Sequence, residues 1–211
     1  MQQPSRGNKI SRRSWLLAGL ATPLFSVRAA ESLEVKFDGD NLHVSAPSLR
    51  FLIGKPLERL KDGASVAYIT QLTLFNDDHV TVVRRRTGRF VVSFALWEEK
   101  FSVTQLVAAP GSRSRSAEGL SAAAAEAWCL DSLVIDTVGL ARDRQFWLRF
   151  ELATADQRDL SSMPDERGLS LSALVDFFSR KPKEGEPHWP ALERRLRLSD
   201  LPRMTGRGRN V

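Results

Sequence analysis

Apolar and polar residues alternate in several short stretches of the chain, which is the pattern of half-buried β-strands. Leu33, Val35 and Phe37 alternate with polar residues, and the alternation resumes over residues 42–46 after the turn-forming residues 38–41. This arrangement predicts a β-hairpin. Residues 56–61 then predict a short helix, because a proline stands near the start, two leucines share one face and a glycine follows the end.

A longer alternating region follows. Residues 66–74 form one apolar stripe, residues 76–78 have turn composition, and residues 80–86 alternate again. Thr87 and Gly88 then suggest a second turn, after which Phe90, Val92, Phe94 and Leu96 make another stripe. The region therefore predicts an antiparallel meander of three strands.

The second half of the chain mixes helix and strand signals. Residues 108–115 predict a surface loop, and the alanine-rich stretch 120–130 predicts a helix. Residues 133–138 and 146–152 predict a second hairpin around 139–143, and residues 171–178 have helical spacing. Residues 181–190 are rich in proline and charge, which is typical of a linker.

Five or six strands in antiparallel order with two or three helices favour a mainly β or α+β fold. It is expected to be either a β-sandwich with helical insertions or an antiparallel sheet with helices on one face. We expect one globular domain over residues 30–180, a C-terminal extension over 181–203 and a disordered tail over 204–211.

Residues 1–29 differ from the rest because they contain five lysines and arginines and no acidic residue. Arg12 and Arg13 stand in a pattern that resembles a twin-arginine signal, and the apolar stretch 15–25 that follows is shorter than the roughly 20 residues that span a bilayer. We expect a cleavable signal peptide that ends before Ala30. A general-secretory signal and an uncleaved anchor are the alternatives. The expected location is periplasmic or extracellular.

The net charge of +6 lies mainly at the ends of the chain. Without residues 1–29, 26 basic residues face 25 acidic ones, and residues 30–179 alone carry 17 basic and 21 acidic residues, a net −4. Binding to nucleic acid requires a basic surface that releases counterions. The body of the chain therefore does not have the composition of a nucleic-acid-binding domain.

Reactive motifs are also missing from the sequence. Ser121 and Ser170 each follow a glycine by two residues but do not complete the nucleophile-elbow pattern, and the three histidines lie far apart. No cofactor or metal motif occurs. The lone Cys129 follows a tryptophan and is expected to be buried and unreactive. Trp97 and Phe101 are expected to belong to the core and its rim, and Glu98 and Glu99 to opposite faces of a strand.

One basic cluster remains as a candidate anion-binding site. Arg84, Arg85, Arg86 and Arg89 surround the turn expected at Thr87 and Gly88, where they could bind a phosphate or an anionic lipid headgroup. The alternative is a solvated hairpin tip whose charges prevent edge pairing between sheets. Strand alternation also places Arg84 and Arg86 on one face and Arg85 on the other.

The stretch from Gly88 to Leu106 (GRFVVSFALWEEKFSVTQL), preceded by LKDGASV at residues 60–66, resembles a family of bacterial exported proteins classed as a domain of unknown function. The resemblance extends over about residues 33–201 and concerns the order of elements. It implies an export context and supplies no catalytic residues.

These observations favour a non-catalytic binding or interaction module of the cell envelope. The expected partner is an envelope protein or a lipid-like ligand, with peripheral membrane contact as a further option. An enzyme whose site is assembled from dispersed residues is the alternative, because catalytic groups are defined by geometry and not by order.

Overall fold

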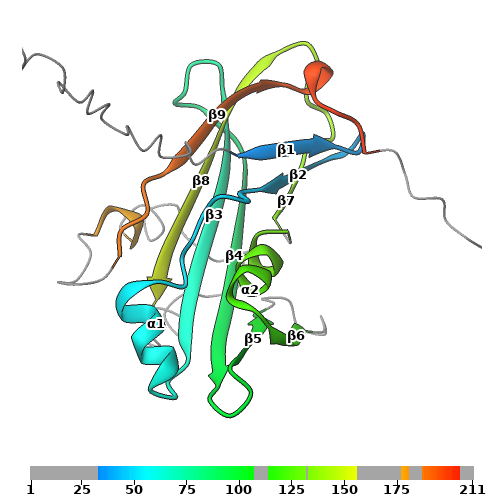
Figure 1. Cartoon of the computed structure of the whole chain (residues 1–211). Helices are drawn as coiled ribbons and strands as arrows, with labels where there is room; N and C mark the ends of the chain where they lie inside the picture. Colours follow the sequence, from blue (N-terminus) through cyan, green and yellow to red (C-terminus); the bar gives the residue numbers. More distant parts are fainter. Residues whose placement is uncertain (1–32, 107–113, 132, 156–176, 181–186, 205–211) are drawn as a thin grey trace, which may run out of the picture.

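The computed structural model describes residues 33–106, 114–131, 133–155, 177–180 and 187–204. The described strands form two antiparallel sheets, accompanied by helices (Figure 1). The strands are β1 (Glu34–Phe37), β2 (Asn41–Ser45), β3 (Val66–Asn76), β4 (Val82–Ala95), β5 (Lys100–Gln105), β6 (Arg115–Leu120), β7 (Val134–Asp136), β8 (Gln145–Ala155) and β9 (Leu192–Arg197). The helices are α1 (Gly54–Lys61), α2 (Ala122–Asp131) and the 3-10 helix η1 (Leu198–Asp200). The mainly β, α+β class expected from the sequence is confirmed.

The larger sheet has the strand order β6-β5-β4-β3-β8-β9, with β3 between two long partners. Every residue of β3 except Asn76 is buried, because both of its faces and both of its edges are covered. The smaller sheet has the order β1-β2-β7, and the expected hairpin over residues 33–46 is confirmed as β1 and β2.

The main hydrophobic core lies between the two sheets and the helices. Tyr68, Leu72 and Phe90 from one face of the larger sheet pack with residues of the smaller sheet, with Leu60 of α1 and with α2. The second face of the larger sheet carries a small separate cluster in which Ala67, Ile69 and Ala155 pack with Phe177. In the view of Figure 1 the smaller sheet, α1 and α2 lie on one side of the larger sheet.

The prediction of a turn at Thr87 and Gly88 is wrong, because β4 continues through both residues. Gly88 pairs with Thr70, and a Cβ at Gly88 would lie 2.6 Å from Thr70 Oγ1 and 3.0 Å from the Phe90 ring. The glycine is thus explained by close packing inside a strand and not by a turn. A long β3 gives β4 a continuous partner, so uninterrupted pairing replaces the turn.

The prediction of a second hairpin from residues 133–138 and 146–152 is also wrong. β7 pairs with β2 in the smaller sheet, whereas β8 pairs with β3 and β9 in the larger one. Ile135 of β7 lies opposite Leu42, and both side chains are buried in the core. Neighbouring strands in the sequence therefore separate because each finds a better-matched partner elsewhere.

The C-terminal residues continue the sheet. β9 pairs with β8 over residues 192–197, and Leu196, Leu198 and Leu201 are buried. The Phe37 backbone N–H donates to the Pro202 carbonyl, and the Met204 N–H donates to the Phe37 carbonyl. The segment expected as an extension thus contains strand β9. Most of the helix expected over 171–178, most of the loop expected over 108–115 and residues 205–211 lie outside the described residues.

Candidate functional site

The four arginines singled out from the sequence lie along β4 and not around a turn. Arg84 and Arg86 pair with Leu74 and Leu72 of β3, and Arg85 and Arg89 pair with Thr73 and Ile69. Because alternate residues of a strand point to opposite faces, the cluster is divided between the two faces of the sheet. The structure therefore does not bring the four side chains together as one anion-binding site.

The Arg84 side chain forms contacts with residues of β4, of β7 and of the loop that follows β7. Its guanidinium donates to the carbonyl oxygens of Val83 and Val138, each at 3.0 Å, and its Nε lies 3.9 Å from Asp136 Oδ2. These contacts connect β4 to the loop that follows β7. Arg84 thus has a structural role in joining the two sheets.

Arg85 lies on the second face, beside a buried polar pair. Gln71 Nε2 donates to Glu151 Oε2 at 2.9 Å, and Gln71 is 6% exposed. Partial burial lowers the pKa of Arg85, and the Glu151 carboxylate opposes that shift by attraction. The Arg85 Nε and Gln71 Oε1 atoms are buried without a hydrogen-bond partner. Arg85 as a whole is only partly buried, and the nearest acidic group on this face is Glu151.

A second polar network spans one end of the same face. Arg149 Nε donates to Glu193 Oε1 at 2.6 Å, and His79 Nε2 lies 3.3 Å from Glu193 Oε2. The His79 ring packs on Trp147 at a centroid distance of 4.7 Å, and the Arg195 guanidinium lies 5.8 Å from the centroid of Trp147. These contacts join β8, β9 and the β3–β4 turn. Arg149 and Glu193 are hydrogen-bonded to each other, whereas His79 Nε2 is buried near Glu193 without a hydrogen-bond partner among the described residues.

Three buried ionisable groups come together beneath α2. The Glu126 carboxylate, 3% exposed, accepts the backbone N–H groups of Phe51 and Leu52 with Oε1, at 2.7 and 2.9 Å. Burial, with a contribution from Glu126, raises the pKa of Cys129 to about 12. Burial also raises the pKa of Tyr68 well above its usual range.

These three groups do not form a catalytic arrangement. A nucleophilic thiol needs a lowered pKa, whereas that of Cys129 is raised. A general base must reach its substrate, whereas Glu126 is 3% exposed, its Oε1 atom accepts two backbone N–H groups and its Oε2 atom lies 3.7 Å from Arg50 NH1. The cluster therefore fixes the segment before α1 onto α2. The burial of Cys129 expected from the sequence is confirmed, at 1% exposure.

The turn between β4 and β5 has a different character. β4 ends at Ala95 and β5 begins at Lys100, so Leu96, Trp97, Glu98 and Glu99 form a four-residue turn. Trp97 is 100% exposed and Leu96 is 54% exposed. The expectation that Trp97 belongs to the core or its rim is wrong. Phe101, for which the same was expected, is buried, with 6% of its surface exposed. Glu98 and Glu99 lie in the turn and not on a strand.

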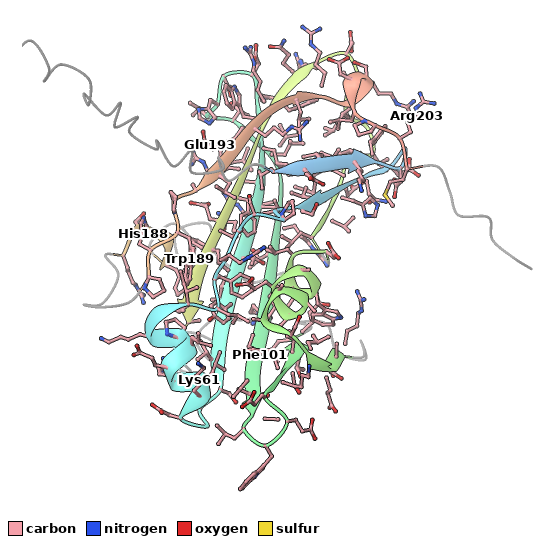
Figure 2. The ribbon with its side chains drawn as sticks, viewed as in Figure 1. Lys61, Phe101, His188, Trp189, Glu193 and Arg203 are labelled. Carbon is pink, nitrogen blue, oxygen red and sulfur yellow. The ribbon has the colours of Figure 1, made fainter. Side chains whose placement is uncertain are left out.

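We name residues 96–99 the tip. It lies at the opposite end of β4 from the β3–β4 turn, because successive connections of an antiparallel meander alternate ends (Figure 1). Figure 2 places the side chains of Lys61 and Phe101 toward this end of the molecule and that of Arg203 at the other. Among the described residues, Trp97 is the most exposed large hydrophobic side chain. The apolar alternation of the sequence runs on to Leu96, one residue past the end of β4 at Ala95, so it did not mark the start of this turn.

Neither a metal centre nor a membrane span emerges from the described residues. They contain no group of three or more histidine, cysteine, aspartate or glutamate side chains placed to hold a metal ion. None of the helices in this part of the chain is long and apolar enough to cross a membrane. Arg12 and Arg13 of the expected signal lie outside the described residues.

Comparison of the sequence with models of known families and with curated proteins, and of the fold with solved structures, finds no match to any of them.

Proposed function

We propose that the chain is an exported, non-catalytic interaction module of the cell envelope, which binds a protein partner through the tip. The observation that carries this proposal is the complete exposure of Trp97 beside the half-exposed Leu96. Burying a tryptophan on a partner removes about 150–250 Å² of surface, worth roughly 4–6 kcal/mol before the costs of association. Tryptophan is accordingly among the residues that dominate binding interfaces.

The rigid surroundings of the tip support this role. β4 and β5 pair in register from Phe90 with Gln105 to Ala95 with Lys100, directly up to the turn. Phe94 and Phe101 pack at a centroid distance of 4.8 Å just below it. A short turn held by a paired hairpin loses little conformational freedom on binding, so more of the burial energy appears as affinity.

The buried ionisable groups support a non-catalytic role. Glu126 anchors backbone N–H groups, and the pKa of Cys129 is raised away from reactivity. On the second face, Arg149 forms an ion pair with Glu193 and Arg195 forms one with Asp77. The described residues thus use these groups for structure, whereas none of them covers Trp97, which is fully exposed in this part of the chain.

Export rests on the sequence. Residues 1–29 combine a basic start, the Arg12–Arg13 pair and a short apolar stretch. A partner reached after export would be a component of the periplasm or the cell envelope.

Photo-crosslinking in cells tests the proposal. A photoreactive amino acid replaces Leu96 in the full chain, which leaves Trp97 in place, and a control chain carries it at the exposed Ser116 of β6. We expect a discrete adduct from position 96 that disappears when Trp97→Ser is added, and no such adduct from position 116. Identical adducts from both positions, or an adduct at 96 that persists without Trp97, would contradict the proposal.

A further inference from the structure

The tip combines its exposed indole with negative charge. Glu98 and Glu99 follow Trp97 directly, and both are exposed. Within the part of the chain that the structure describes, neither carboxylate forms a hydrogen bond or an ion pair. Lys61 and Asp62 at the end of α1 add one charge of each sign at this end of the molecule, and Lys100 adds a positive one (Figure 2 labels Lys61). The local balance remains negative.

Glu99 adopts an unfavourable backbone conformation. Its φ is 52°, in the left-handed region that glycine and asparagine adopt most easily. A glycine at this position would relieve the strain, yet the chain has a carboxylate there. The left-handed φ belongs to the geometry of the hairpin turn, and local stability alone therefore does not favour a glutamate at this position.

We propose that the occupant of the tip is a protein surface with an apolar pocket for Trp97 and lysine or arginine side chains around its rim. This inference rests on the proposed function and adds the chemistry of the partner. Trp97 supplies the buried anchor, and Glu98 and Glu99 supply charges complementary to the rim. Complementary rim charges raise the rate of association and exclude partners of the wrong sign.

The same charges disfavour a lipid surface as the occupant. Membrane surfaces that contain anionic lipids have a negative surface potential, which attracts lysine and arginine side chains. Two carboxylates beside the indole would be repelled by such a surface. A tip that entered an anionic interface would therefore be expected to carry basic residues around the tryptophan.

Charge variants of the tip test the inference with the same crosslinker at position 96 and Trp97 retained. Glu98→Gln with Glu99→Gln keeps the size of both side chains, and we expect the adduct yield to fall by up to about tenfold. Glu98→Lys with Glu99→Lys should abolish the adduct. Glu99→Gly is the folding control: it relieves the left-handed strain, so thermal stability should hold or rise while the adduct yield falls.

Unchanged adduct yield in the double Gln and double Lys variants would overturn the inference while leaving the proposed function intact. If Trp97→Ser alone removed the adduct, the inference would likewise be overturned and the proposed function would stand. Flotation of the full chain with vesicles of phosphatidylglycerol, dependent on Trp97 and insensitive to both glutamates, would also overturn it in favour of a lipid surface.

Discussion

The carboxylate of Glu126 in α2 accepts the backbone N–H of Phe51 at 2.7 Å, across 75 positions of the sequence. The same oxygen accepts the N–H of Leu52 at 2.9 Å, and Arg50 NH1 lies 3.7 Å from the other oxygen. These contacts satisfy two buried backbone donors in the segment that enters α1. They also join α2 to the segment that enters α1, while the tip lies at the end of the separately paired strands β4 and β5.

Replacing Glu126 is expected to destabilise the fold. Glu126→Ala leaves two buried N–H groups without an acceptor and should lower the free energy of unfolding by about 2–4 kcal/mol. Glu126→Gln keeps one carbonyl oxygen and should cost about 1–2 kcal/mol. Urea unfolding of the full chain measures both, with the exposed Glu118→Ala as control. Equal stability of Glu126→Ala and the wild-type chain would show that these hydrogen bonds do not contribute.

Cys129 is expected to resist a maleimide reagent at pH 7–8 in the native chain and to react after denaturation. Cys129 is 1% exposed and its pKa is raised to about 12. The reagent therefore cannot reach the sulfur, and the reactive thiolate form is not populated at this pH. The folded pKa lies above the unfolded value of about 8.5, so this group favours folding below pH 8.5 and loses that effect as pH rises toward 12. Rapid native labelling would contradict the packing of α2.

The hydrophobic pattern predicted the local elements of the chain better than their pairing. The β1–β2 hairpin, α1 and α2 depend on residues close in sequence, and all three are present. The separation of β7 from β8 depends on Ile135 packing opposite Leu42, nearly a hundred positions earlier. Local alternation contains no information on such a choice of partner. Gly88 was misinterpreted for the same reason, since its contact with Thr70 lies on another strand.

The candidate site was harder to predict than the fold. Arginines near a glycine suggested a turn, but β4 passes through them and divides them between two faces. Trp97 was assigned to the core or rim because tryptophan is highly buried on average. Its exposure follows from the end of β4 at Ala95, two residues earlier, and strand boundaries are uncertain by more than that from sequence alone.

The arginines of β4 are expected not to drive membrane binding. Arg84 is held by the Val138 carbonyl, and Arg85 lies on the opposite face beside Glu151. Vesicle sedimentation of the full chain at low and physiological salt compares the wild type with a variant in which residues 84, 85, 86 and 89 are all glutamine. We expect equal sedimentation of both. If the wild type sedimented with the vesicles at low salt and less so at physiological salt, while the variant failed to sediment, these arginines would act together on an anionic surface.

Export is expected to depend on the two arginines of the signal. Replacing Arg12 and Arg13 with lysines keeps the charge but removes the twin-arginine pattern, so precursor should accumulate in the cytoplasm. Cell fractionation with immunodetection of the tagged chain measures this. Undiminished export of the variant would indicate the general-secretory route.

Capture of partners from envelope extract tests the role of the tip most directly. The immobilised full chain is compared with Trp97→Ser and with Val80→Ser, which removes another exposed apolar residue, 78% exposed, at the opposite end of β4. If Trp97 is the binding anchor, its loss should reduce the captured partner by about tenfold or more, equivalent to about 1.4 kcal/mol, while Val80→Ser leaves capture unchanged. Equal capture by all three chains would contradict the account.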